Sequence, residues 1–82
     1  MNKEAVLSLL VKNLKKAIPE FADEELDTAK SYKELGVSSL ELVEVVTRTA
    51  KELGLSLAFK ELGSVKTTDD LAEVLLRLQP KA

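Results

Sequence analysis

The stretch ELGVSSLELVEVV, residues 34–46, places a glycine and two serines directly before a run of valines and leucines. Ser38 and Glu41 have the spacing of a capping box, in which each side chain binds the backbone amide of the other residue, so we expect a helix to begin directly after Ser38. Apolar residues recur at helical spacing up to Gly54, a residue typical of the position that follows a helix. The predicted helix therefore runs from Ser39 to about Leu53.

This helix is expected to carry two neighbouring apolar stripes. The first suits the protein core and consists of Leu42, Val45, Val46, Thr49 and Leu53. The second lies beside the charged residues Glu44 and Lys51 and consists of Leu40, Val43 and Thr47. The pattern thus predicts one buried face and one face available for other contacts.

Three further helices are predicted. The first runs from Glu4 to Ile18, ends at Pro19, and buries Leu7, Leu10, Val11, Leu14 and Ile18. A short helix covers residues 58–62, Ala58 to Leu62, and is closed by Gly63.

The last helix is capped by Thr67 or Thr68 and stopped by Pro80, with Asp69 and Asp70 in its first turn. Its buried face is expected to consist of Leu71, Val74, Leu75 and Leu78.

Residues 20–35 mix charges with widely spaced apolar side chains, so we expect a long ordered loop held by Phe21, Leu26, Tyr32 and Leu35. The predicted fold is all-α: a small four-helix bundle of three main helices and one short helix, with a long loop between the first and second helices. The 82 residues, 1–82, fit a single domain.

The chain has no cysteine and no histidine, and its net charge is −2. Without imidazole or thiolate, the usual serine hydrolase and most metal sites are excluded. Carboxylate-only or lysine-based chemistry stays open, but no paired arrangement indicates it, so we expect neither an enzyme nor a metal site. The charge argues against nucleic acid, and no apolar run approaches the ~20 residues that span a membrane. The lack of cysteine favours a cytoplasmic protein.

Ser39 lies at the first position of the predicted helix and is not needed as its cap. A helix N-terminus offers unpaired amides and partial positive charge, which favour a phosphate, so Ser39 could carry a phosphodiester. The alternative is a polar residue at a solvated helix start. The local pattern leaves both interpretations open.

Residues 35–40, Leu-Gly-Val-Ser-Ser-Leu, resemble the Leu-Gly-x-Asp-Ser-Leu motif of acyl carrier proteins and related thiolation domains. The resemblance continues through residues 41–46, Leu53-Gly54 and residues 67–71, and it covers most of the chain. It implies that Ser39 bears a 4′-phosphopantetheine arm, which a phosphopantetheinyl transferase installs from coenzyme A. It also implies that the protein holds acyl groups as thioesters and catalyses nothing itself.

The resemblance further assigns roles to the neighbours of Ser39. Leu40 becomes the apolar residue beside the arm, and Glu41 and Glu44 become acidic recognition positions. The expected partners are acyltransferases, ketosynthases or other acyl-processing enzymes, which would read the exposed residues Leu40, Val43, Glu44 and Thr47 of a monomeric carrier. Val43, Phe59 and Leu62 are candidates to line a shelter for an acyl chain between this helix and the short helix, although core packing is the role we expect for Phe59 and Leu62.

Several residues depart from the pattern of fatty-acid-synthesis carriers. The usual aspartate before the serine is Ser38, and later positions of the helix are Thr47, Arg48, Ala50 and Lys51. These departures favour polyketide biosynthesis. Residues 59–66 are also similar to the corresponding region of some discrete polyketide carriers, including donor carriers of β-branching cassettes.

Three alternatives remain at this point: a fatty-acid-synthesis carrier, an aminoacyl or peptidyl carrier, and an unmodified helical interaction module. The motif does not separate the carrier classes. Met1 and the terminal QPKA favour a discrete protein over a domain taken from a synthase.

Overall fold

The computed structural model describes residues 2–56 and 59–78, and its regular elements are helical. Three main helices form its body: α1 (Lys3–Ala17), α3 (Ser39–Leu53) and α4 (Thr68–Leu78). Shorter helical segments connect them: the 3₁₀ segment η1 (Pro19–Phe21), the one-turn helix α2 (Tyr32–Leu35) and the 3₁₀ segment η2 (Phe59–Ser64). The predicted all-α architecture, three main helices plus a short one, is confirmed.

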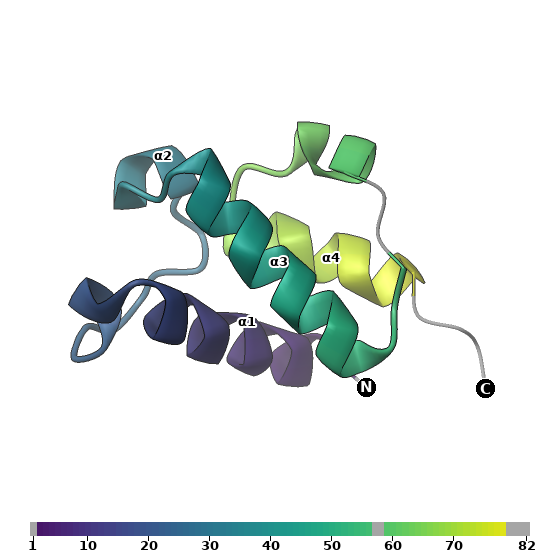
Figure 1. Cartoon of the computed structure of the whole chain (residues 1–82), viewed down its shortest axis with the longest axis horizontal. Helices are drawn as coiled ribbons and strands as arrows, with labels where there is room; N and C mark the ends of the chain where they lie inside the picture. Colours follow the sequence, from purple (N-terminus) through teal and green to yellow (C-terminus); the bar gives the residue numbers. More distant parts are fainter. Residues whose placement is uncertain (1, 57–58, 79–82) are drawn as a thin grey trace.

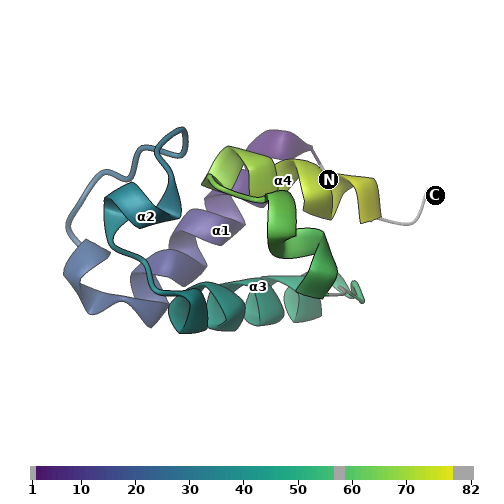
Figure 2. The same cartoon turned by 90° about the horizontal axis from the view of Figure 1, so that it is seen from above.

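The main helices are arranged around α1. Both α3 and α4 pack against it, one in front and one behind in Figure 1. Seen from above, η2 lies on the side of α3 and α4 that faces away from α1, and α2 stands near the start of α3 (Figure 2). The long connection between α1 and α3 therefore closes one end of the bundle.

The helix α1 begins at Asn2, whose Oδ1 accepts a hydrogen bond from the Ala5 amide at 2.8 Å, and it ends before Pro19, close to the predicted bounds. Its buried residues, with Ile18 directly after the helix, are Val6, Leu10, Asn13, Leu14 and Ile18. Leu7 and Val11, which belong to the predicted apolar face, are only partly buried, and Leu7 packs against the edge of the core.

The buried face of α1 also includes Asn13, a polar residue that the apolar pattern did not place in the core. It is 1% exposed, and its Nδ2 donates to Thr49 Oγ1 at 2.7 Å and to Glu52 Oε1 at 3.0 Å. The Thr49 hydroxyl in turn donates to the Val45 carbonyl at 2.8 Å. These bonds hold the Asn13 side of α1 against α3.

The core is continuous from α1 through α3 to α4. On α3 the predicted core residues Val45, Val46 and Thr49 are buried, whereas Leu42 and Leu53 are partly buried at its edge. The long loop contributes its predicted anchors: Phe21 and Tyr32 are buried, and Leu26 and Leu35 pack against the core. The loop is thus ordered by apolar contacts, as expected.

Backbone hydrogen bonds also join this loop to the start of α4. The Tyr32 amide donates to the Lys66 carbonyl at 2.8 Å, and the Asp69 amide donates to the Thr28 carbonyl at 3.1 Å. Between them Ser31 and Thr67 form an isolated antiparallel bridge. Two segments that are far apart in the sequence are therefore fixed side by side.

The start of α4 is capped by Thr67: its Oγ1 accepts from the Asp70 amide at 3.0 Å, and Asp70 Oδ2 accepts from the Thr67 amide at 3.2 Å. Leu71, Val74 and Leu75 are buried as predicted, but Leu78 is only partly buried because it lies in the last turn.

The short segment η2 differs from its prediction. It is a 3₁₀ segment that runs through Gly63 to Ser64 instead of closing at Gly63. Ala58 and Pro80, the predicted start of this segment and stop of α4, lie outside the described residues.

Candidate functional site

Ser39 is the first residue of α3, and it is exposed. The N-cap is the preceding residue, Ser38, whose Oγ accepts from the Glu41 amide at 3.2 Å while Glu41 Oε1 accepts from the Ser38 amide at 3.0 Å. The cap is complete without the Ser39 hydroxyl, for which the described residues provide no hydrogen-bond partner. An exposed hydroxyl that the cap does not use therefore lies at a helix N-terminus.

The turn before Ser38 delivers the chain to this position. Helix α2 ends in a Schellman motif, in which the Gly36 amide donates to the Lys33 carbonyl at 3.2 Å and the Val37 amide donates to the Tyr32 carbonyl at 2.9 Å. Gly36 adopts a φ of 80°, a conformation that strains other residues. The glycine thus ends α2 and allows α3 to begin three residues later.

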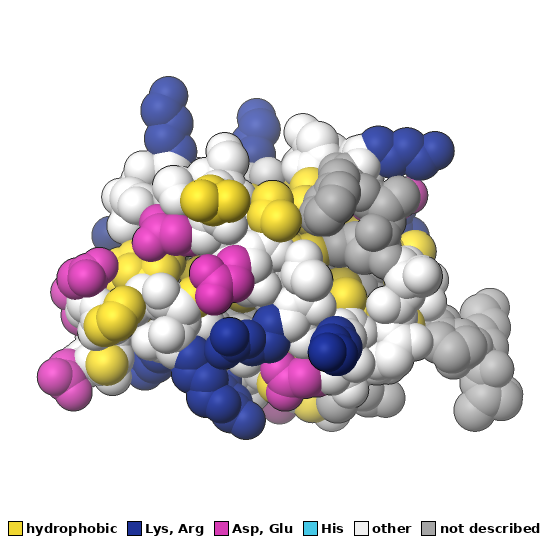
Figure 3. Space-filling model, in the orientation of Figure 1, with side chains coloured by type: hydrophobic (Ala, Val, Ile, Leu, Met, Phe, Trp, Pro, Cys, Tyr) yellow, Lys and Arg dark blue, Asp and Glu magenta, His cyan; other side chains and the backbone are white. Residues whose placement is uncertain are grey.

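The residues after Ser39 include an exposed apolar side chain. Leu40 is 81% exposed, and Val43 is partly buried one helical turn further on. Thr47, a further turn along, is exposed. Figure 3 shows apolar side chains at the surface over the first half of α3, above a group of lysine and arginine side chains. This part of α3 has no covering element in the described chain.

The carboxylates of Glu41 and Glu44 on α3 already have partners within the helix, so they are less available to bind another protein than their sequence positions indicate. Glu41 is partly buried and its carboxylate is engaged in the cap. Glu44 is exposed, and its Oε1 lies 3.8 Å from Arg48 Nη2, so it forms an i,i+4 ion pair. Negative charge at the start of the helix is therefore partly neutralised within the helix itself.

A surface hollow of about 630 Å³ opens beside Ser39. It lies between α2, the start of α3 and the link before α4, and its apolar lining includes Val37, Leu42 and Val65. Two exposed lysines, Lys33 and Lys66, also line it. This hollow has no signal in the sequence, because its parts meet only through the backbone bonds between the long loop and the start of α4.

Tyr32 contributes to the same hollow and is 4% exposed. Burial raises the pKa of its hydroxyl to about 12, and the Thr68 side chain opposes only part of this rise. The Tyr32 hydroxyl reaches no partner in hydrogen-bonding geometry among the described residues. It is a structural group that stays protonated near neutral pH.

The residues predicted to shelter an acyl chain are not brought together at this hollow. Val43 and Leu62 do not line it, and Leu62 packs against the core, the role expected for it. The side chain of Phe59 lies outside the described part of the structure.

A second hollow, of about 700 Å³, lies along α1. It is lined by the apolar residues Leu7, Val11 and Ala22 and by the lysines Lys12, Lys15 and Lys16 of α1. It shares no lining residue with the hollow beside Ser39.

Over the described ranges, no group of three or more acidic, histidine or cysteine side chains is placed to hold a metal ion. None of the helices described is long and apolar enough to cross a membrane.

Comparisons with known proteins agree with this geometry. The family model "Phosphopantetheine attachment site" matches residues 4–75. The chain is 31% identical over 75 residues to the polyketide biosynthesis acyl-carrier-protein AcpK of Bacillus subtilis (strain 168), and the alignment covers 92% of each protein. It is also similar, with a TM-score of 0.82 and 31% identity, to a chain in the crystal structure of the curacin biosynthetic pathway HMG synthase in complex with acetyl donor-ACP. That match covers 90% of this chain and 95% of the other.

Proposed function

The chain belongs to the phosphopantetheine attachment site family and is a polyketide-type acyl carrier protein, and from this premise we propose that Ser39 is the residue that bears its 4′-phosphopantetheine arm. The observation that supports Ser39 is its exposed hydroxyl at the N-terminus of α3, which the cap does not use. The amides of the first helical turn and their partial positive charge suit a phosphodiester. Ser39 and the neighbouring Leu40 are both exposed, so other proteins can reach the attachment point of the arm.

Attachment then requires a partner enzyme. The Ser39 Oγ forms a bond to the phosphorus that carries the pantetheine part of coenzyme A, the bond from that phosphorus to the nucleotide part breaks, and the hydroxyl proton passes to a base. Among the described residues no side chain is hydrogen-bonded to the Ser39 hydroxyl, so we assign the base to the phosphopantetheinyl transferase. The contribution of the carrier is to hold the serine at an exposed helix start.

When bound, the arm supplies a thiol on which acyl groups are held as thioesters. We propose that residues 1–82 form a single monomeric carrier domain with no catalytic activity of its own, and that the tether raises the effective concentration of the acyl group for each enzyme that docks. Leu40, Val43 and Thr47 with Glu41 and Glu44 form the proposed recognition face. An acyltransferase, a ketosynthase or another acyl-processing enzyme would contact this face.

Mass spectrometry after incubation with coenzyme A and a broad-specificity phosphopantetheinyl transferase tests the site. We expect the wild-type chain and Ser38→Ala to gain the mass of the arm, and Ser39→Ala to fold without gaining it. Far-UV circular dichroism of the three proteins shows whether each is folded. Modification of Ser39→Ala would overturn the assignment, and a wild-type chain that gains no mass would overturn the proposed function.

A more specific role is favoured by the structural comparison. The matched chain comes from a complex of an HMG synthase with an acetyl donor carrier, and the similarity extends over nearly the whole of both chains. We propose that this protein is a donor carrier that delivers a short acyl group, acetyl, to an enzyme of the HMG synthase type.

Transfer from the loaded protein tests this role. The chain is loaded with acetyl-phosphopantetheine from acetyl-coenzyme A and mixed with a polyketide-pathway HMG synthase, and the acetyl mass on the carrier is followed. We expect the acetyl group to pass to the synthase at a rate well above that from a fatty-acid-synthesis carrier. Equal rates from the two carriers would contradict the donor role but leave the attachment site standing.

A further inference from the structure

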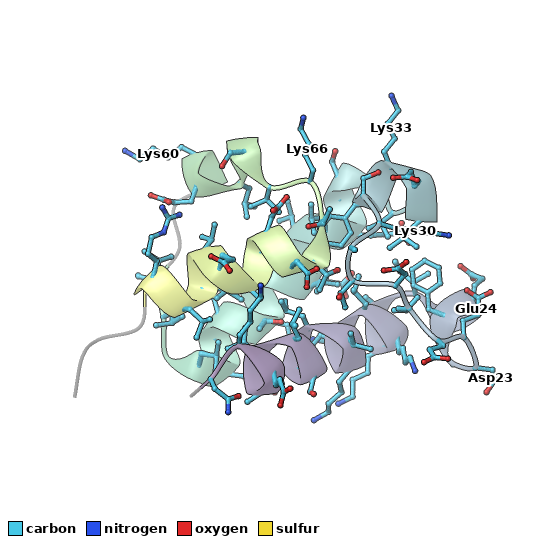
Figure 4. The ribbon with its side chains drawn as sticks, turned by 180° about the vertical axis from the view of Figure 1, so that it is seen from behind. Asp23, Glu24, Lys30, Lys33, Lys60 and Lys66 are labelled. Carbon is cyan, nitrogen blue, oxygen red and sulfur yellow. The ribbon has the colours of Figure 1, made fainter. Side chains whose placement is uncertain are left out.

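Two cationic side chains stand at the hollow beside Ser39. Lys33 lies in α2 and Lys66 lies in the link before α4, and both line this hollow. Figure 4 shows the two side chains extending in the same direction from one edge of the molecule, whereas Lys60 of η2 extends sideways from that edge. This arrangement places positive charge beside the proposed attachment point.

The backbone fixes the spacing of the two lysines. The amide of Tyr32, the residue before Lys33, donates to the carbonyl of Lys66 at 2.8 Å, and the bridge between Ser31 and Thr67 extends the pairing. The carbonyl of Tyr32 accepts from Val37, which leads directly to Ser38. One residue thus connects both lysines to the start of α3 through main-chain bonds.

Neighbouring carboxylates are bonded to backbone amides and form no ion pair with these lysines in the described part of the chain. Glu34 and Glu41 are engaged in the caps of α2 and α3. The Asp70 carboxylate accepts from the backbone amides of Lys66 and Thr67, which hold the pKa of Asp70 below its usual value, and the Lys66 charge makes a smaller contribution in the same direction. In the part of the chain that the structure describes, no carboxylate lies within 4.0 Å of either lysine ammonium group.

We propose that Lys33 and Lys66 bind the phosphodiester of the arm attached to Ser39. This inference rests on the proposed function. A phosphodiester carries one negative charge, and lysine binds phosphate as a point charge that can approach from several directions. The amides at the start of α3 supply a third favourable contact. The root of the arm is then held at the rim of the hollow, over Val37, Leu42 and Val65.

Held in this way, the arm leaves Ser39 toward α2 and the link before α4. The exposed residue Leu40 then stays open for a docking enzyme. An acidic group of that enzyme could compete for the two lysines and free the arm as docking proceeds.

The double variant Lys33→Gln/Lys66→Gln tests the proposal, with Lys60→Gln as the matched control. Lys60 is exposed and lies on the same side of the molecule, but it does not line the hollow. Each protein is converted to the modified form, and mass spectrometry confirms the gain of the arm. The ³¹P chemical shift of the phosphodiester is then compared with its value after unfolding in urea, and stability is measured with and without the arm.

We expect the ³¹P resonance of the wild-type and Lys60→Gln proteins to move on unfolding, and that of the double variant to move much less. Attachment should raise the folding equilibrium constant about two- to fivefold more in the wild type than in the double variant, the range given by exposed ion pairs. Equal shifts and equal gains in all three modified proteins would overturn the lysine contact. If Lys60→Gln reduced the ³¹P shift and the stabilisation by the arm as much as the double variant does, the proposal would also be overturned, because a lysine outside the hollow would then affect the phosphodiester equally. Absence of the arm mass in the wild type would overturn the proposed function itself.

Discussion

Tyr32 is a residue whose side chain is buried with an unpaired hydroxyl. Burial raises its pKa to about 12, above the value of about 10 in an unfolded chain. The folded state therefore disfavours the phenolate form of Tyr32. Below about pH 10 this has no effect on the free energy of unfolding, but as the pH rises toward 12 the free energy of unfolding falls by about 2–3 kcal/mol.

Urea unfolding between pH 9 and pH 12 checks this prediction, because Tyr32→Phe should lack that part of the alkaline loss. Lysine deprotonation affects both proteins, so the difference between them isolates Tyr32. The phenylalanine variant should be at least as stable as the wild type at pH 7, since it removes an unsatisfied hydroxyl. Identical alkaline profiles would contradict the prediction.

Ser38 provides a second prediction for a single residue. Ser38→Ala removes the oxygen that accepts from the Glu41 amide and should lower the free energy of unfolding by ~1 kcal/mol, while the arm is still attached. Ser38→Asp retains the cap and adds a charge favoured by the helix dipole, but the Glu41 carboxylate nearby opposes it. We expect a net change of only ~0.5 kcal/mol or less. Chemical denaturation of both variants measures these effects, and an unchanged midpoint for Ser38→Ala would argue against the cap.

Two leucines of α1 can test which face of this helix is buried. Leu10 is fully buried, whereas Leu7 is partly exposed, although both belong to the apolar pattern. Leu10→Ala should therefore lower the free energy of unfolding by about 2–5 kcal/mol, and Leu7→Ala by less than about 1.5 kcal/mol. Denaturation midpoints of the two variants provide the comparison. Equal losses would show that α1 is rotated from the position described.

Helix α3 provides a prediction about partner choice, because it combines acidic residues near its start with Arg48 and Lys51 further on. Glu44→Lys should slow acyl transfer to the native partner, mainly through association and less so at high salt. Lys51→Glu should improve transfer to enzymes of fatty acid synthesis that prefer acidic carriers.

The structure refines this expectation, since Glu44 pairs with Arg48 at 3.8 Å. Arg48→Gln frees the Glu44 carboxylate and should strengthen its effect on the native partner. Acyl-transfer rates of the three variants at low and moderate salt test whether the charges of α3 select the partner. If none changes more than about twofold, far below the tenfold that 1.4 kcal/mol represents, the apolar residues of α3 carry recognition.

The ends of individual helices could be predicted from the sequence, because they depend on capping interactions between residues that are close in the chain. The bounds of α3 follow from the Ser38–Glu41 cap and from Gly54, whose φ of 71° ends the helix. The sequence did not reveal the inward position of Asn13, because a polar residue is buried only when partners such as Thr49 are supplied by another helix. It also missed the pairing of Tyr32 with Lys66, which depends on two segments that meet only in the folded chain.

The molecule as a whole has one core, to which the long loop contributes Phe21 and Tyr32. We therefore predict a single cooperative unfolding transition. The chain has one tyrosine and no tryptophan, so tyrosine fluorescence reports on the loop while far-UV circular dichroism reports on the helices. The two signals should change at the same denaturant concentration. A fluorescence change that precedes the helical signal would show that the loop detaches from an otherwise folded bundle.

The central position of α1 has a consequence for the order of synthesis. Because α3 and α4 both pack on α1 and both follow it in the chain, α1 leaves the ribosome before its packing partners. A nascent chain that ends before α4 exposes Val6, Leu10 and Leu14, whose cover is incomplete at that stage. During translation, the apolar face of α1 is therefore accessible to chaperones and proteases until α4 has been synthesised and packs against it.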